Sequence, residues 1–170
     1  MRGMVRGSVI LFSAFMLLTG CQGNNGDIWG SFGDKSSSLK DEADVSYYRN
    51  DQLVATGNAQ FREKNYGKAY ALFKKAIWVF PQDPQAWLGF AASSDMIGRF
   101  DSSDKGYKQL AKMIGNSPVL YNNMGYSYML RGELVTARKY LLKAYEMDPS
   151  NQVTANNLEM LKNSTQFAMR

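Results

Sequence analysis

The side chains best suited to catalysis are almost missing from this chain. Its 170 residues include one Cys and no His. Without a His it cannot form a Ser-His-Asp or Cys-His nucleophile pair, and a single Cys closes no intrachain disulfide and no Cys/His zinc site. Acidic pairs such as Asp101 with Asp104 are typical of charges at a helix start. We therefore expect no catalytic residue, no metal site and no enzyme activity.

The single Cys follows a segment that is typical of a secretory signal. Arg2 and Arg6 lie in a short N-terminal stretch without acidic residues, and an apolar run from Ser8 to Leu18 follows. A membrane-spanning helix needs about 20 apolar residues, so this run is too short to span a bilayer. Its flanks match those of a signal peptide, which we predict over residues 1–20.

The residues Leu18-Thr19-Gly20-Cys21 resemble the lipobox of bacterial lipoproteins, in which the Cys is lipidated and becomes the new N-terminus. That resemblance implies a covalent diacylglycerol and an N-acyl chain on Cys21 and no other cofactor. Because each buried CH₂ contributes about 0.8 kcal/mol, several chains give a stable membrane anchor. In the lipoproteins, an Asp directly after the Cys resembles an inner-membrane retention signal. This chain has Gln22 at that position. The expected location is the periplasmic face of the outer membrane; an ordinary signal peptide with a coincidental Cys is the alternative.

The charge of the chain argues against nucleic acid as a partner. The formal net charge is +5, and removal of Arg2 and Arg6 with the signal would leave +3. Nucleic-acid binding depends on clustered cations, and export from the cytoplasm disfavours it further. No Gly-rich phosphate loop is present, so we also expect no small-molecule substrate.

A polar segment separates Cys21 from the rest of the chain. Residues 21–46 are rich in Gly, Ser, Asn and charge, and we predict a tether that is flexible after the lipidated Cys. Such a segment would span about 25–30 Å on average. Trp29 and Phe32 stand out in it; they rest on the lipid interface or the domain surface, or they dock a partner.

A period of 34 residues organises most of the remaining chain. Three segments, 50–83, 84–117 and 118–151, align without a gap and agree in side-chain size. Large residues recur near the start of each unit, and small residues follow four positions later, where two helices can approach closely. Asp83-Pro84 and Ser117-Pro118 place a capping side chain before a Pro, as at a helix start.

These units resemble the tetratricopeptide repeat, which pairs two antiparallel helices in each repeat. The third unit matches best, through Tyr121, Met124, Gly125, Tyr128, Ala137, Leu141, Ala144 and Pro149. We predict an all-α fold over residues 47–163, a short solenoid of three repeats with a capping helix at 152–163 and a frayed tail at 164–170. Leu110 stands in a column of small residues, where it is expected to push its helices apart and make the middle repeat a soft point.

The resemblance implies that the first helix of each repeat lines a concave, peptide-binding groove. Its predicted contacts are apolar and amide-bearing side chains with a few charges. They are Asn58, Phe61, Arg62, Gln85, Leu88, Asp95, Met96, Asn122, Tyr126, Met129, Asn156 and Met160. One subclass of the family grips C-terminal carboxylates with cations in this groove. The matching places here hold Val54, Asn58, Gly89, Val119 and Asn123, so recognition of chaperone tails is disfavoured.

The anchor, the tether and the repeats together are similar to the TadD-type lipoproteins of tight-adherence (Flp) pilus loci. The run from Tyr121 to Ser127 carries part of that likeness. It implies an outer-membrane scaffold that binds protein segments, with a secretin or another pilus-secretion component as partner. The alternatives are a periplasmic adaptor for peptidoglycan-modifying enzymes and a pilotin of another type IV pilus system.

Overall fold

The computed structural model describes residues 43–168, and these form helices joined by short turns. The predictions for residues 1–20, for Cys21 and for the tether up to residue 42 lie outside the described residues. The elements are η3 (Asn50–Gln52), α1 (Leu53–Arg62), α2 (Tyr66–Val79), α3 (Pro84–Met96), α4 (Phe100–Ile114), α5 (Pro118–Leu130), α6 (Leu134–Met147) and α7 (Gln152–Ala168). The all-α prediction is confirmed. None of these helices combines the length and the apolar character needed to cross a membrane.

The helix ends repeat with the predicted period. The Asp83 carboxylate accepts hydrogen bonds from two backbone N–H groups at the start of α3, and the Ser117 hydroxyl accepts one at the start of α5. Between the two helices of each repeat, the backbone enters the left-handed region at Lys64, Gly98 and Gly132, with φ of 63°, 74° and 77°. Successive positions are 34 residues apart. The first repeat therefore has a Lys in the turn where the other two repeats have a Gly.

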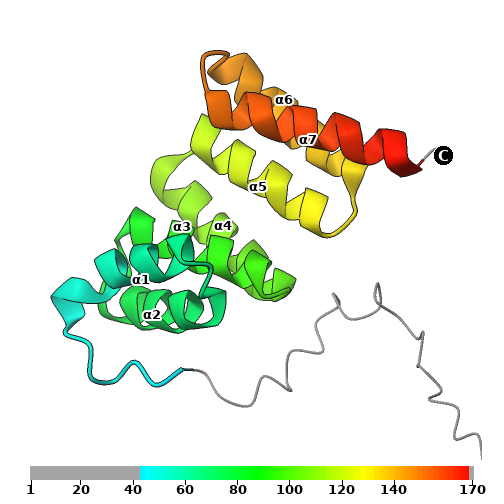
Figure 1. The fold of residues 1–170 in the computed structure, drawn as a ribbon. Coiled ribbons are helices and arrows are strands. Elements are labelled where there is room, and N and C mark those ends of the chain that lie inside the picture. The colour runs from blue at the N-terminus through cyan, green and yellow to red at the C-terminus, as the bar shows by residue number, and fades with distance from the viewer. Residues whose placement is uncertain (1–42, 169–170) are drawn as a thin grey trace, which may run out of the picture.

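The helices form two layers, as Figure 1 shows. Within each repeat the two helices pack as an antiparallel pair, and α1, α3, α5 and α7 contact one another in order. The small residues lie where helices approach most closely: Gly57 faces the ring of Phe73, and Gly125 faces Leu141. The layer of first helices is therefore continuous, and we identify it as the inner face of the solenoid.

Leu110 does not push the helices of the middle repeat apart. Its side chain is 1% exposed and packs with Ala91, Tyr107 and Leu120, the last from the next repeat. On the same helix, a Cβ added at Gly106 would lie 2.8 Å from the Cβ of Ala91, so α3 and α4 are already in close contact. The prediction of a helix pair spread by Leu110 was wrong, because Gly106 provides the close approach and Leu110 fills the space toward α5.

Both ends of the folded body extend beyond the predicted limits. Val45 and Tyr48 pack against the first core cluster, so the described chain is held on the domain before residue 47. The Lys75 ammonium donates hydrogen bonds to the backbone carbonyls of Val45, Ser46 and Tyr48 at 3.3, 3.2 and 3.0 Å. At the other end, α7 continues to Ala168, past the predicted limit of the capping helix at residue 163.

Candidate functional site

The inner face contains a hollow of about 280 Å³, which we call the groove. Side chains from the first helices and the cap line it, together with residues from the second helices of repeats one and two. Five predicted contacts meet there: Phe61, Asp95, Met96, Asn122 and Tyr126. They come from α1, α3 and α5, three different repeats, so an occupant of the groove would contact all three at once.

The other predicted contacts do not line this hollow. Asn58, Arg62 and Gln85 are exposed on α1 and α3. Leu88 and Met129 are half-buried and pack against core clusters between helices. On the cap, the Asn156 side-chain oxygen accepts a hydrogen bond from Gln152 at 2.9 Å, and Met160 is 48% exposed.

Amide groups join the cap to the wall of the groove. The Asn157 side-chain nitrogen donates to the Asn122 side-chain oxygen at 2.9 Å, which links α7 to α5. The Asn123 amide donates to the Val119 carbonyl of its own helix at 2.8 Å. The Asn122 oxygen is thus already satisfied, whereas its amide nitrogen is available to donate to a ligand carbonyl.

Tyr126 presents a half-buried aromatic ring to the groove. Burial raises the pKa of its hydroxyl, and electrostatic interaction with Tyr66 and Asp95 raises it further. At neutral pH the group is therefore a neutral phenol that both donates and accepts hydrogen bonds. Such a side chain combines apolar contact area with one polar end, as peptide-binding surfaces often require.

Asp95 lies at the groove, but its carboxylate serves the packing between helices. The carboxylate accepts hydrogen bonds from the Ser127 hydroxyl at 2.7 Å and the Tyr107 hydroxyl at 2.8 Å. The Arg131 guanidinium lies 3.9 Å away and also binds Asp104 in a bidentate arrangement. Burial raises the pKa of the Asp95 carboxyl, against the lowering effect of these hydrogen bonds. Asp95 therefore ties α3 to α4 and α5 and has little capacity left for a ligand.

Six residues that line the groove are not among the predicted contacts: Tyr66, Ala92, Tyr107, Asn123, Val153 and Asn157. Val153 and Asn157 are four positions apart on α7, a spacing that places them on one helix face. That spacing was a usable signal, whereas the 34-residue period leads from Asn122 to Asn156. The prediction selected the neighbouring Asn156, which is exposed.

The groove has the chemistry of a binding surface. Among the described residues, those that line it include no Lys and no Arg, and the carboxylate of Asp95 is held by hydrogen bonds. The described part of the chain also holds no group of His, Cys, Asp and Glu residues that would bind a metal. Aromatic, thioether and amide groups remain, and these suit a neutral, extended protein segment.

Comparison with known proteins agrees with the repeat fold. No family model matches the chain. Among curated proteins, it is 31% identical over 120 residues to the small glutamine-rich tetratricopeptide repeat-containing protein 2 of Mycosarcoma maydis, an alignment that covers 71% of this chain and 34% of that protein. The chain thus spans about a third of the length of this relative.

Two solved structures are similar over most of the described residues. The first TPR of Spaghetti (RPAP3), bound to an HSP90 peptide, has a TM-score of 0.58 at 18% identity, covering 74% of this chain and 98% of that chain. The type III secretion chaperone SycD of Yersinia enterocolitica, in complex with a peptide of the translocator YopD, has a TM-score of 0.55 at 21% identity, covering 68% and 93%. At these identities the likeness shows the fold, and the predicted short repeat solenoid is confirmed.

Proposed function

We propose that this tetratricopeptide-repeat protein is a scaffold that binds a segment of another protein in its groove. The observation that carries the proposal is the hollow on the inner face, where side chains of all three repeats meet. A ligand that spans the repeats would gain contacts from α1, α3 and α5 together. The two structural neighbours described above hold peptides of other proteins, which supports a role of the same kind.

The lining predicts the chemistry of the bound segment. Because no cation lines the groove among the described residues, an acidic tail would lose its hydration there without an ion pair in return. An apolar or amide-rich segment would gain contact with Phe61, Met96 and Tyr126 and a hydrogen bond from the Asn122 amide. We therefore infer a neutral, extended segment as ligand.

The N-terminal residues support the location that we propose, and the likeness to tight-adherence pilus lipoproteins supports the partner. The lipobox-like run that ends at Cys21 supports a lipoprotein anchored at the periplasmic face of the outer membrane. The likeness to tight-adherence pilus lipoproteins supports a secretin or another pilus-secretion component as the partner. The scaffold would then hold a segment of that component close to the membrane during assembly.

Two substitutions in the groove test the binding site. Asn122→Ala removes the amide donor and Tyr126→Ala removes the half-buried ring, and each should weaken partner binding about tenfold or more. Tyr145→Ala on α6 is the matched control, because that ring is 40% exposed and does not line the groove. Proteins that co-purify with the full chain from membranes are identified by mass spectrometry. Unchanged recovery with both groove variants would show that the partner binds elsewhere.

A deletion strain tests the assigned system. Loss of pili or adhesion with normal cell shape supports assembly of a pilus. Altered septation or altered levels of wall enzymes would instead identify an adaptor for peptidoglycan-modifying enzymes. Loss of a different type IV pilus would identify a pilotin of that system.

A further inference from the structure

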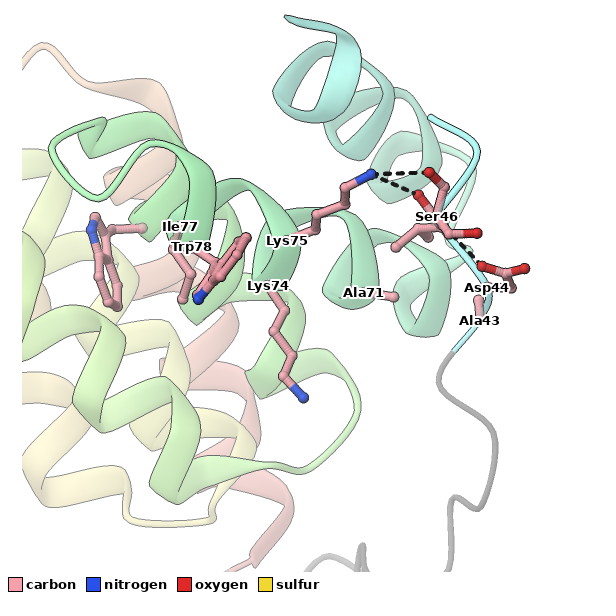
Figure 2. A pocket seen from close by; sticks show the side chains of 10 residues that line it. Ala43, Asp44, Ser46, Ala71, Lys74, Lys75, Ile77 and Trp78 are labelled. Carbon is pink, nitrogen blue, oxygen red and sulfur yellow. Dashed lines mark hydrogen bonds between the residues drawn. The ribbon is translucent and has the colours of Figure 1, made fainter. Parts of the chain in front are cut away.

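A second hollow, of about 780 Å³, lies along α2 at the point where the described chain begins. Ala71, Lys74, Lys75 and Trp78 of α2 line it, and residues 43–46 form one of its edges. Figure 2 shows Lys75 reaching across to Ser46 at this edge, with Trp78 farther along the helix. We call this feature the α2 hollow; the proposed function makes no use of it.

One wall of the α2 hollow is apolar and exposed to solvent. Trp78 is 85% exposed, although its indole is one of the largest apolar groups in the chain. Trp87 also contributes to the wall and donates its indole N–H to the Pro81 carbonyl at 2.8 Å. An aromatic surface of this kind gains free energy when another apolar side chain covers it.

Lys75 determines how the chain enters this hollow. Its three hydrogen bonds to backbone carbonyls hold residues 45–48 against α2. Ala43 and Asp44, the first described residues, consequently lie on the rim. The part of the chain that precedes residue 43 therefore starts at one end of the hollow, and the exposed face of Trp78 lies farther along α2 (Figure 2).

We propose that the tether segment from Asp27 to Phe32 occupies the α2 hollow, with the Trp29 ring against Trp78. This segment reads Asp-Ile-Trp-Gly-Ser-Phe and contains the two aromatic residues of the tether. The acidic Asp27 adjoins the apolar residues, and Lys74 and Lys75 outnumber the single acid Asp44 in the lining of the hollow, so the net charges are opposite. The apolar side chains of this segment, which lie in an otherwise polar tether, would be buried in the α2 hollow.

The length of chain between the two sites favours this occupant over one from another molecule. Trp29 and Ala43 are 14 residues apart, and a flexible chain of that length spans about 19–22 Å on average. That is enough to turn back along α2. A linker of this kind gives the segment an effective concentration on the order of millimolar, so even a weak contact is populated.

Docking of the segment would shorten the tether. Given the lipid anchor of the proposed function, the free part would shrink from about 23–27 Å for residues 22–42 to about 11–13 Å for residues 22–26. The groove would then be held close to the membrane surface, and release of Trp29 would let it reach farther. The α2 hollow thus sets the distance at which the scaffold works.

Photo-crosslinking in the full chain tests the proposal. p-Benzoylphenylalanine replaces Trp78, and cells are irradiated with the protein in its membrane. Mass spectrometry then locates the crosslinked residues. We expect crosslinks within the same chain at residues 27–32, and the same product from a second probe at position 74. The reference is a probe at Val135 on α6, a side chain that is 88% exposed but remote from this hollow.

Three variants complete the test. Trp29→Ala or Phe32→Ala should lower the yield about tenfold, the change expected when one buried aromatic contact is lost. Ser37→Ala, in the same tether, should leave the yield unchanged. Crosslinks from position 78 to lipid, to another protein or to no target would overturn the proposal, as would equal yields from positions 78 and 135. Because this product forms within one chain, the result is independent of whether the groove binds a partner.

Discussion

Gly89→Ala is expected to destabilise the solenoid because α2 and α3 touch at this position. Gly89 is buried, and a Cβ added there would overlap the ring of Phe73, closer than real carbon atoms approach. Phe73 is 1% exposed and packs among core residues, so it has little room to move. Overpacking of this kind costs about 1–3 kcal/mol, offset by about 0.5–1 kcal/mol because Ala favours a helix over Gly. The net loss is about 0.5–2 kcal/mol.

Gly67→Ala is the matched control for this prediction. Gly67 also lies in a helix, but a Cβ added there meets no atom within 4 Å. This change should stabilise the protein by about 0.4–1 kcal/mol, because it lowers the entropy of the unfolded chain without a clash. The two Gly→Ala variants should thus differ in the free energy of unfolding by about 1–3 kcal/mol and shift stability in opposite directions.

Urea unfolding, followed by far-ultraviolet circular dichroism, measures the free energy of unfolding of the wild type and of both Gly→Ala variants. A third variant, Phe73→Leu combined with Gly89→Ala, identifies the cause. Phe73→Leu alone should destabilise the protein, whereas in the Gly89→Ala background it should cost less, because the smaller side chain relieves the overlap. Equal stability of the two Gly→Ala variants, or additive effects of Phe73→Leu and Gly89→Ala, would refute the reasoning.

Three further predictions concern the anchor and the buried polar cluster. Cys21→Ser should abolish lipidation and leave an unprocessed or mislocalised precursor; a mutant still labelled by a radioactive fatty acid would contradict this. Arg131→Lys loses the planar group that binds Asp104 and contacts two aromatic rings. It should cost about 1 kcal/mol and speed hydrogen exchange in α5 but not in α1; uniform exchange would argue against a local role. The raised pKa of Asp95 means that the folded state binds this proton more tightly, so acidification through that pKa stabilises the fold. As the pH is lowered from about 7 to about 4, the free energy of unfolding of the wild type should rise relative to that of Asp95→Asn, measured by urea titration. A difference that stays constant or falls would contradict this prediction.

The helices were predictable because their signals are local and repeated. A capping residue before a Pro and a small residue at a fixed spacing act within one turn or one helix pair, and a 34-residue period repeats each signal. The network around Asp95 was not predictable in this way. Its partners Tyr107, Ser127 and Arg131 lie 12 to 36 residues away, and only the packing of three helices brings them together.

The groove shows the same division between local and long-range information. Phe61, Met96, Asn122 and Tyr126 were predicted as contacts from their positions in the first helices, and the structure brings them together around one hollow. On the cap, the rotation of the helix decides which of two adjacent Asn residues faces α5. That rotation depends on how Leu158 and Leu161 pack against α6, which the repeat pattern does not describe.

The attachment of Lys75 determines where mechanical force enters the domain. A pull on the chain ahead of residue 43 would load two kinds of contact together: the packing of Val45 and Tyr48 on the first core cluster and the three hydrogen bonds from the Lys75 ammonium. The load would therefore reach α2 and the buried part of the first repeat directly, and not only through η3, the next element in sequence. We expect a domain attached in this way to resist being peeled open from its N-terminal end, because the packing and the hydrogen bonds would have to break together.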